Sequence, residues 1–418
     1  MINLKRNFYN KIKGNKSNGI TIVALVILLS ILVILTPLHT FCITPQQQKV
    51  QEELNSSIIS TLDEIDFSGF NNIIENFEEK QISIFSLSNI KDKVYSIISG
   101  ENAVNYNNFF ASIFSNVIEL IISYLPILSV IVAIGVISNL LNGIKSKFNE
   151  KSTGNIVSLV CFFAAVILII SIVNNLATKT GNSIFSMVKQ MNVLFPILLT
   201  LMAATGATAS VGAFQPVVAI MSTYIADIFN FYILPLFMIS FVFSIISNFS
   251  NNVKLDKFNS FISSLFKWSV GIIFTLFFAV FSIQGITAGS FDSIGIRTTK
   301  YTIKSYVPIM GGYISDGMDL ILASSTLIKN AVGFVGILLI ITTILSPLLE
   351  LVIFSLLLKL VSAILQPMGN TVSNFLSSTS KSVTMLSSSI IAISFMYLIS
   401  VGLVMSTSNM VVWWVAIF

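Results

Sequence analysis

The chain has 418 residues, of which 54% are hydrophobic and 10% charged, and its mean hydropathy is +0.88. Soluble domains carry about 25% charged residues, so this composition excludes an ordinary globular protein and predicts an all-α integral membrane protein. The net charge is +5, but the basic residues lie beside apolar runs, where they orient helices in a bilayer, and we expect no nucleic-acid partner.

The chemistry open to the chain is limited by its two cysteines, Cys42 and Cys161, and its one histidine, His39. These numbers exclude a disulfide framework and a histidine-based metal site or catalytic triad. The apolar runs hold no paired aspartates, His-Glu metal motif or Gly-x-Ser element. We therefore expect a protein that is not an enzyme and has no cofactor and no metal.

Residues 1–42 have the outline of a targeting segment. The first sixteen residues carry five bases and no acid, and residues 20–35 are uninterrupted apolar before a helix breaker at Thr36-Pro37. This pattern fits a signal peptide or an uncleaved signal anchor, and the sequence leaves both open. Either one sends the residues that follow across the membrane.

Residues 43–116 are predicted to form an acidic, helical, extracytoplasmic region. Residues 43–118 hold ten acidic and four basic residues. Apolar residues recur at helical spacing in two sets, Val50, Leu54, Ile58, Leu62 and Ile65, then Ile90, Val94, Ile97 and Ile98. Breaks are predicted at Ser68-Gly69 and at Gly100. Helices this short need packing partners to be stable.

Residues 117–418 are predicted to form a polytopic transmembrane helix bundle. The apolar runs of spanning length are 117–141, 156–173, 191–248 (two or three crossings), 268–288, 331–346, 348–366 and 385–406. They indicate about seven to nine spans, with possible re-entrant hairpins where prolines and small residues recur.

The distribution of basic residues predicts an orientation. With the N-terminus in the cytoplasm, the loops at Lys145–Lys151 and Lys254–Lys267 both fall on the cytoplasmic side, as the positive-inside rule requires. The same count places 289–330 outside, although Arg297, Lys300 and Lys304 favour the inside. We therefore expect the stretch Ser282–Asn330 to be partly membrane-embedded rather than a free loop.

Polar residues beside or within apolar runs are candidates for a conduit or a structural role, because their burial in lipid is costly. They are Asp227, Gln284, Arg297, Lys300, Asp316, Asp319, Glu350 and Lys359. Glu350 and Lys359 are too far apart for an i,i+4 pair, so we expect one at each interface. Asp316 and Asp319 share one helix face, which we expect to be solvated, and Gln284 is expected at a helix break.

Several short motifs resemble those of one family, the stage III sporulation protein AE family of endospore-forming Firmicutes. They are S-x-Q-G at Ser282–Gly285, G-I-R-T-x-K at Gly295–Lys300, V-P-x-x-G at Val307–Gly311, Ile328-Lys329-Asn330, and A-I-L-Q-P at Ala363–Pro367. Pro196-Ile197 and Gln215-Pro216 also fit, although a histidine is expected in place of Gln215. The likeness covers residues 50–410 in layout.

The resemblance implies a non-enzymatic membrane component of a sporulation channel complex, comparable to a feeding tube, needed for late forespore development. It also implies a location in the mother-cell membrane around the engulfed forespore. The implied partners are other stage III sporulation membrane proteins, a forespore-side partner across the intermembrane space, further copies in an oligomer, and the lipid bilayer. An alternative is a stand-alone secondary transporter with a site between broken helices near 196–216 and 308–330.

Overall fold

The computed structural model describes residues 45–75, 90–100, 106–145, 151–249, 255–306, 311–368 and 371–415. Every element within these ranges is a helix, so the predicted all-α class is confirmed. The chain divides into two units, Met1–Glu53 and Leu54–Phe418. The predicted targeting segment at 1–42 lies outside the described residues.

Six helices among the described residues are long and apolar enough to cross a membrane. They are α6 (Tyr106–Lys145), α7 (Lys151–Ala204), α8 (Thr208–Ile228) with its continuation, α10 (Asp256–Tyr306), α11 (Gly311–Leu365) and α12 (Thr371–Val415). A π-helical segment, Phe229–Ile233, joins α8 to α9 (Leu234–Phe249) ahead of Pro235, which cannot donate a backbone hydrogen bond.

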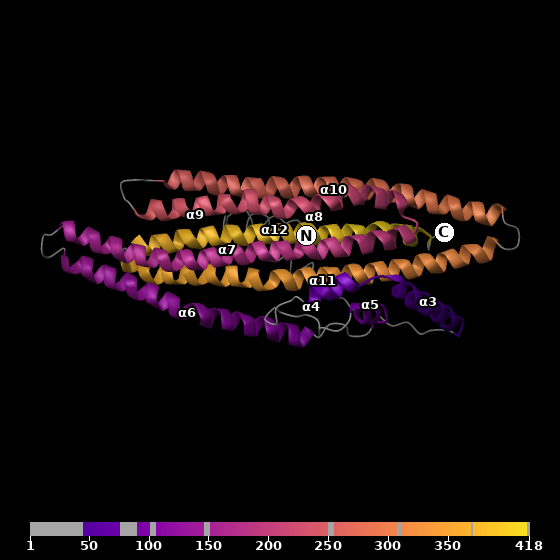
Figure 1. Ribbon diagram of the computed structural model, residues 1–418, viewed down its shortest axis with the longest axis horizontal. Helices are drawn as coiled ribbons and strands as arrows, with labels where there is room; N and C mark the ends of the chain where they lie inside the picture. Colours follow the sequence, from indigo (N-terminus) through magenta and orange to yellow (C-terminus); the bar gives the residue numbers. More distant parts are fainter. Residues whose placement is uncertain are drawn as a thin grey trace, which may run out of the picture. The chain divides into compact units, whose positions relative to one another are not determined.

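The long helices of the larger unit lie side by side and alternate in direction, with α8 and α9 forming one continuous rod (Figure 1). The connections α6–α7, α9–α10 and α11–α12 therefore meet at one end of the bundle, here named the first end. The connections α7–α8 and α10–α11 meet at the opposite end, the second end. In Figure 1 the first end is on the left.

The six candidate spans are fewer than the about seven to nine spans predicted from the apolar runs, because several runs share one helix. The runs 156–173 and 191–204 are both in α7, and 331–346 and 348–365 are both in α11. The polar residues between the first two runs remain helical, and Pro347 lies inside α11 without ending it. Neighbouring helices can satisfy a backbone carbonyl that a proline leaves free.

The stretch Ser282–Asn330 forms the second half of α10 and the first half of α11. The described part of it contains no re-entrant hairpin, and residues 307–310 lie outside the described ranges. Arg297, Lys300 and Lys304 are therefore on a long helix rather than in a free loop. Their conflict with the positive-inside rule weakens if this helix extends well beyond the bilayer.

The length of α7 indicates that it does extend beyond a bilayer. Its 54 residues make a helix about 80 Å long, against a hydrocarbon core of about 30 Å. Its exposed side chains change along its length, from Leu159, Val160, Phe163, Ile167 and Ile170 to Asn174, Asn175, Thr178, Lys179 and Asn182. The exposed side chains of α7 are thus apolar in its first-end part and mainly polar beyond Ile170, where Phe185 is a large exposed apolar exception.

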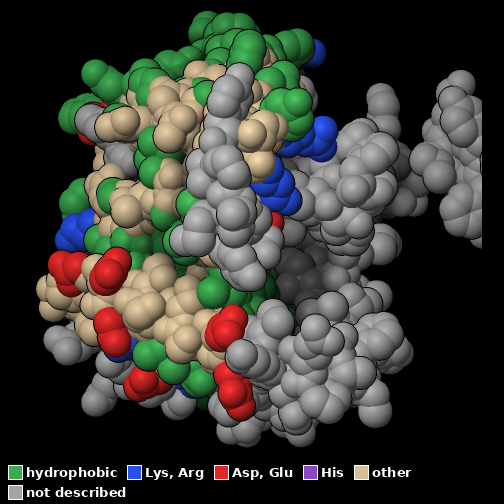
Figure 2. Space-filling model, turned by 90° about the vertical axis from the view of Figure 1, so that its right-hand side faces the viewer, with side chains coloured by type: hydrophobic (Ala, Val, Ile, Leu, Met, Phe, Trp, Pro, Cys, Tyr) green, Lys and Arg blue, Asp and Glu red, His purple; other side chains and the backbone are tan. Residues whose placement is uncertain are grey.

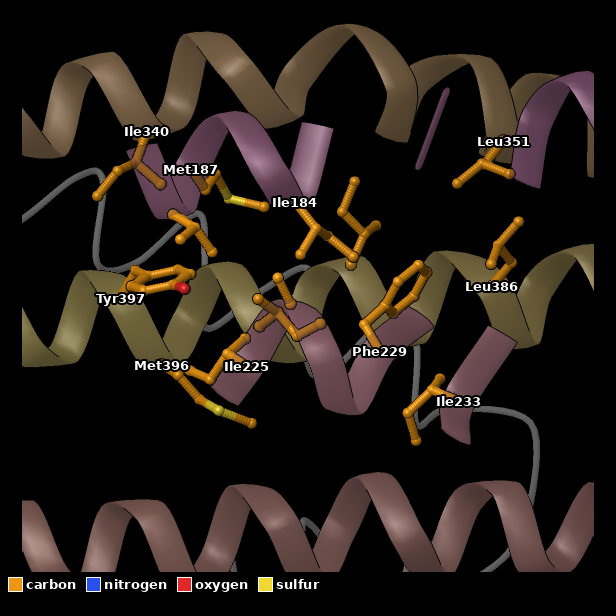
Figure 3. Packing of buried hydrophobic residues seen from close by; sticks show 14 of the residues in the cluster. Ile184, Met187, Ile225, Phe229, Ile233, Ile340, Leu351, Leu386, Met396 and Tyr397 are labelled. Atoms are coloured by element: carbon orange, nitrogen blue, oxygen red, sulfur yellow. The ribbon is translucent and has the colours of Figure 1, made fainter. Parts of the chain in front are cut away.

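Helix α12 packs against α7, α9, α10 and α11 and forms the centre of the bundle. Figure 3 shows its Leu386, Met396 and Tyr397 among side chains of α7, α8 and α11. Tyr397 is fully buried. The facing residues labelled there are Ile184, Met187, Ile225, Phe229, Ile233, Ile340 and Leu351. This apolar packing is what holds the long helices in register.

Two short helices match the predicted amphipathic sets, α3 (Pro45–Glu64) and α5 (Ile90–Ile98), and a third, α4 (Ser68–Glu75), begins at the predicted break and was not itself predicted. The described part of the larger unit places α4 against α7 and α5 against α11. Ser57 Oγ of α3 donates to Ser324 Oγ of α11 at 3.1 Å, and Lys91 pairs with Asp63. The long helices are thus the partners that these short helices require.

The break between α3 and α4 is fixed by a local cap. The backbone N–H of Ser68 donates to Asp66 Oδ1 at 2.9 Å, which satisfies a donor at the start of α4. Hydrogen bonds from the hydroxyl and the backbone N–H of Ser68 hold the pKa of Asp66 below its ordinary value. Gly100, with φ +75°, follows α5 at the second predicted break.

The turn between α7 and α8 depends on Gly206. Its φ is +76°, and the bonds Ala207 N–H to Met202 O (3.1 Å) and Gly206 N–H to Ala203 O (2.8 Å) form a Schellman motif. A Cβ at this position would also lie 3.2 Å from Ile296 Cγ1. The turn therefore requires a residue without a side chain.

A Gly206→Ala variant is expected to lose about 1–2 kcal/mol of stability, because an L-residue is strained at positive φ. The matched control is Gly212→Ala inside α8, where an added Cβ meets nothing within 4 Å and should stabilise by roughly 0.4–1 kcal/mol. Unfolding of the purified protein by SDS titration in mixed micelles measures both. Equal effects from the two substitutions would contradict the assignment of the strained turn.

Candidate functional site

A cluster of buried polar groups ties α6, α7 and α11 together. Glu350 is 7% exposed. Lys179 Nζ donates to its Oε1 and Oε2 at 2.8 and 3.0 Å, and Tyr124 Oη donates to Oε1 at 2.7 Å. The Tyr124 ring also packs on Phe354, with centroids 5.0 Å apart. A carboxylate inside an apolar bundle is thereby both paired and hydrogen-bonded.

The cluster lies where α7 changes from apolar to polar exposure. The Lys179 side chain is 48% exposed while that of Glu350 is 9% exposed. The ammonium can therefore reach the surface while the carboxylate cannot. This arrangement could hold the three helices in a fixed register or could accept and release a proton at a boundary with water.

A second buried charge, Lys329 of α11, lies farther toward the second end. It is 0% exposed, and its Nζ donates to Met405 O at 2.9 Å and to Val404 O at 3.4 Å. No ion pair to Lys329 is found among the described residues. Gly333, one turn later, would place a Cβ 2.5 Å from Met405 Sδ, so α11 and α12 approach closely here.

A Lys329→Met variant is expected to be at least as stable as the parent, by roughly 0–4 kcal/mol, because it removes a buried charge and keeps the side-chain length. The two carbonyls lie inside α12 and can keep their intrahelical donors. The control is Lys189→Met, which replaces an exposed lysine beside Phe185. A marked loss of stability in SDS titration would instead identify the ammonium as the tie between α11 and α12.

Hydrogen bonds between hydroxyl and amide groups also join these helices. Ser362 and Ser373 each donate to the other's carbonyl, and Ser355 and Ser380 do the same nearer the middle of α11. Gln190 Nε2 of α7 donates to Thr343 Oγ1 at 2.6 Å. Such interhelical bonds add specificity to packing in lipid.

The second end holds a charge-assisted cap and an ion pair. Asp292 of α10 is 4% exposed and accepts from the backbone N–H of Ala209 at 2.8 Å and of Ser210 at 2.9 Å. These are orphan donors of the first turn of α8. Lys300 pairs with Asp319 and thereby joins α10 to α11. Acidic and basic side chains both lie among hydrophobic ones on the surface in Figure 2.

The candidate residues predicted from the sequence do not form one site. Glu350 is buried and pairs with Lys179, and Lys359 is exposed; that one of the two lies at each interface stays a prediction. Asp227 and Arg297 are exposed. Lys300 and Asp319 pair, and the Asp316 side chain lies outside the described ones.

Gln284 lies inside α10, not at a helix break as predicted. Its Oε1 is buried without a hydrogen-bond partner among the described residues. Tyr124, Lys179 and Asp292 were not predicted from the sequence to take part in these contacts. Tyr124 could have been singled out because it lies within an apolar run, where a buried hydroxyl needs a hydrogen-bond partner.

A shallow groove runs between α7 and α8, and Asn192, Thr200 and Gln215 supply its polar groups. It lies in the first region predicted for a transporter site. However, Pro196 and Pro216 lie inside continuous helices, so the helix break nearby is the turn at Gly206. Among the described residues, no group of three or more His, Cys, Asp or Glu side chains could hold a metal ion.

Comparison with known proteins identifies the family. The model of the family described as stage III sporulation protein AE matches residues 88–408. The protein named Stage III sporulation protein AE from Bacillus subtilis (strain 168) is 23% identical over 321 residues, which are 77% of this chain and 80% of that protein. No solved structure matches this chain. Because the match takes in most of the chain and all six candidate spans, this chain belongs to the stage III sporulation protein AE family, and it is a membrane protein of sporulation.

Proposed function

We propose that this protein is a non-enzymatic subunit of a channel complex that links the mother cell and the forespore. The observation that carries the proposal is the family match at 88–408, which coincides with the bundle itself. The complex would contain other stage III sporulation membrane proteins and a forespore-side partner, and several copies of this chain. The role would be to support late forespore development.

The form of the bundle supports this role. Helices α7, α10 and α11 have 54, 51 and 55 residues, each more than twice the roughly 20 that cross a bilayer. Helix α4 packs on α7, where Gly69 lies beside Val193 in its second-end half, and α5 packs on α11. If the second end lies in the intermembrane space, this projecting part offers a surface for partners there.

Deletion of the gene tests the proposal. The deletion strain is expected to complete engulfment and then to stop before late forespore gene expression, with normal vegetative growth. Reintroduction of the parent gene should restore heat-resistant spores. Normal sporulation in the deletion strain would contradict the proposal. A Lys329→Met gene that accumulates normally but fails to restore spores would assign a functional role to that ammonium.

The proposed orientation puts the first end in the cytoplasm and the second end, with α4 and α5, outside. Single cysteines in a Cys42→Ser/Cys161→Ser background test it. Ser305→Cys, near the second end, should react with a membrane-impermeant maleimide in intact cells, and Ser146→Cys should react after lysis. The reverse labelling pattern would show that the two ends of the bundle lie on the opposite sides of the membrane from those proposed.

The alternative, a stand-alone secondary transporter, would use the groove between α7 and α8. Its amide and hydroxyl lining is the observation that favours it. Purified chain in sealed vesicles should then move a solute without partners, and Gln215→Ala should reduce that flux. Absence of transport by the chain alone, with transport by the assembled complex, favours the channel subunit.

A further inference from the structure

The second-end half of α10 exposes a line of mainly apolar side chains. They recur at spacings of three and four residues, the spacing of a helix that packs along another helix. We name them the α10 stripe: Ile283, Thr287, Phe291, Ile294, Thr298 and Tyr301. On the opposite face, a Cβ added at Gly289 would lie 3.1 Å from Thr407 of α12. Ile294, five residues later, is about 140° away around the helix. The stripe therefore points away from the bundle.

The α10 stripe is too far from the first end to share a bilayer with the apolar surface there. A Cβ at Gly206 would lie 3.2 Å from Ile296 Cγ1, so this part of α10 is level with the turn that ends α7. The exposed apolar part of α7 reaches Ile170, which is about 54 Å before Gly206 along the helix, whereas a hydrocarbon core is about 30 Å thick. Phe291 and Ile294 are each 65% exposed. Exposed apolar patches outside lipid mark docking surfaces.

Basic side chains flank the α10 stripe on one side. Arg297 and Lys304 are exposed and lie about 60° and 80° from Ile294 around the helix. Residues 281–306 contain one acidic residue, Asp292, which is buried as the cap of α8. If two α10 stripes paired with each other, these bases would meet no exposed acidic side chain of that half-helix. Charge complementarity favours a partner that carries acidic groups beside apolar ones.

The short helices of the same chain carry a face of this kind. The pair between Lys91 and Asp63 holds the start of α5 beside the end of α3. Around this pair lie four exposed acidic residues and two exposed large apolar ones. We name them the acidic face: Ile59, Asp63, Glu64, Asp66, Asp92 and Tyr95. Its charge and its apolar side chains complement those of the α10 stripe.

The acidic face and the α10 stripe lie on opposite sides of the bundle. A Cβ at Gly333 of α11 would meet Met405 of α12, and one at Gly289 of α10 would meet Thr407. Positions two residues apart differ by about 200° around a helix, so α11 and α10 lie on opposite sides of α12. Helix α5 packs on α11. Figure 1 shows α10 along the upper edge and α4 and α5 along the lower one. In Figure 2 most acidic side chains lie in the lower part, below a hydrophobic upper edge.

The two faces are also level along the bundle axis. The Lys300–Asp319 pair joins α10 to α11 within the stripe. Ser57 Oγ of α3 donates to Ser324 Oγ of α11 at 3.1 Å, and Ser324 is about 7.5 Å from Asp319 along α11 in the direction of the first end. The α10 stripe is about 27 Å long and extends in that direction, so Ser57 lies within its length. Two copies upright in one membrane can therefore join these faces without a shift along the axis.

We propose that a second copy of this chain docks its acidic face onto the α10 stripe. Ile59 and Tyr95 of one copy lie against the stripe of the other, and the acidic side chains lie beside Arg297 and Lys304. The contact is heterologous, so each copy keeps one face of each kind for a further copy until a ring closes. The inference rests on one part of the proposed function, the presence of several copies. Absence of the contact contradicts this inference alone, whereas normal sporulation after gene deletion contradicts the channel role alone.

Disulfide formation between copies tests the contact. Two differently tagged forms of the full chain are co-expressed in a Cys42→Ser/Cys161→Ser background, one with Ile294→Cys and the other with Ile59→Cys. Oxidation of the membranes should give a disulfide-linked dimer that carries both tags, and neither form expressed alone should give a dimer. The matched control replaces Ile294→Cys by Thr299→Cys, an exposed position of α10 about 140° from Ile294, and should give several-fold less mixed dimer.

Charge reversal tests the flank of the stripe. Lys304→Glu in the Ile294→Cys form should lower the yield of mixed dimer by up to about five-fold, because an exposed ion pair contributes up to about 1 kcal/mol. Glu64→Lys/Asp92→Lys in the Ile59→Cys form should restore the yield. Lys189→Glu, which reverses an exposed lysine of α7, should leave the yield unchanged.

The proposal is overturned if the mixed dimer is no more abundant than in the Thr299→Cys control. A dimer from the Ile294→Cys form alone overturns it too, because α10 would then pair with itself. Absence of both dimers, with Ile294→Cys unreactive toward a membrane-impermeant maleimide before and after lysis, would place the stripe in lipid. SDS titration verifies folding. If Ile294→Cys lowers the free energy of unfolding, Tyr301→Cys takes its place, and absence of its mixed dimer refutes the contact.

Discussion

A Lys179→Met variant is expected to lose roughly 2–4 kcal/mol of stability and to be less stable than a Glu350→Gln variant. Removal of the lysine leaves the Glu350 carboxylate buried with Tyr124 as its remaining donor in the cluster, and an uncompensated buried charge is strongly destabilising. Removal of the carboxylate leaves a lysine that is 48% exposed and can turn to solvent. That exposure is why the expected loss lies below the value for fully buried pairs.

The double variant Lys179→Met/Glu350→Leu should recover most of the lost stability, because apolar residues of similar volume often replace a buried pair without cost. SDS titration of the purified variants in mixed micelles gives the free energies. Lys189→Met, which changes an exposed lysine of the same helix, should have little effect. If the double variant is as unstable as Lys179→Met, the ion pair is not the origin of the loss.

The short helices were predictable from sequence, and the long ones were only partly so. The spacing of Ile90, Val94 and Ile97 gives α5, and Gly100 follows its end, because local periodicity and a positive φ are properties of a few adjacent residues. The continuity of α7 was not predictable from hydropathy. The polar stretch around Asn174 and Asn175 is compatible both with a loop and with a helix that extends into water, so its composition does not distinguish the two.

The polar cluster was half predictable. The sequence singles out Glu350 because a carboxylate in an apolar run is costly. Its partner Lys179 is 171 residues away, and one-dimensional spacing can identify only partners on the same helix. Lys359 was the nearest basic residue in the chain, but it lies on the opposite side of α11. Register between distant helices, set by packing around α12, decides which charges meet.

Asp292 shows the same limit at a helix terminus, and its replacement gives the second large expected effect. The residue before α8 is Ala207, which supplies no side-chain cap. The cap comes instead from Asp292 on α10, whose two oxygens accept from Ala209 and Ser210. A carboxylate there also meets the positive end of the α8 dipole. No local signal in the sequence marks a cap that another helix provides.

An Asp292→Ala variant is expected to lose roughly 2–4 kcal/mol, because the buried N–H of Ser210 and the part-buried N–H of Ala209 each lose a charged acceptor. Asp292→Asn should lose less, since one amide oxygen can still accept. Thr298→Ala is the control, an exposed residue of α10 whose hydroxyl bonds only within its own helix at Ile294 O. SDS titration gives the free energies, and protease cleavage at the α7–α8 turn reports the local effect.

If Asp292→Ala unfolds with the parent's free energy but the turn becomes sensitive to protease, the cap orders only α8. Because the same carboxylate joins α10 to α8, a global loss would mean that the second end unfolds cooperatively with the rest of the bundle.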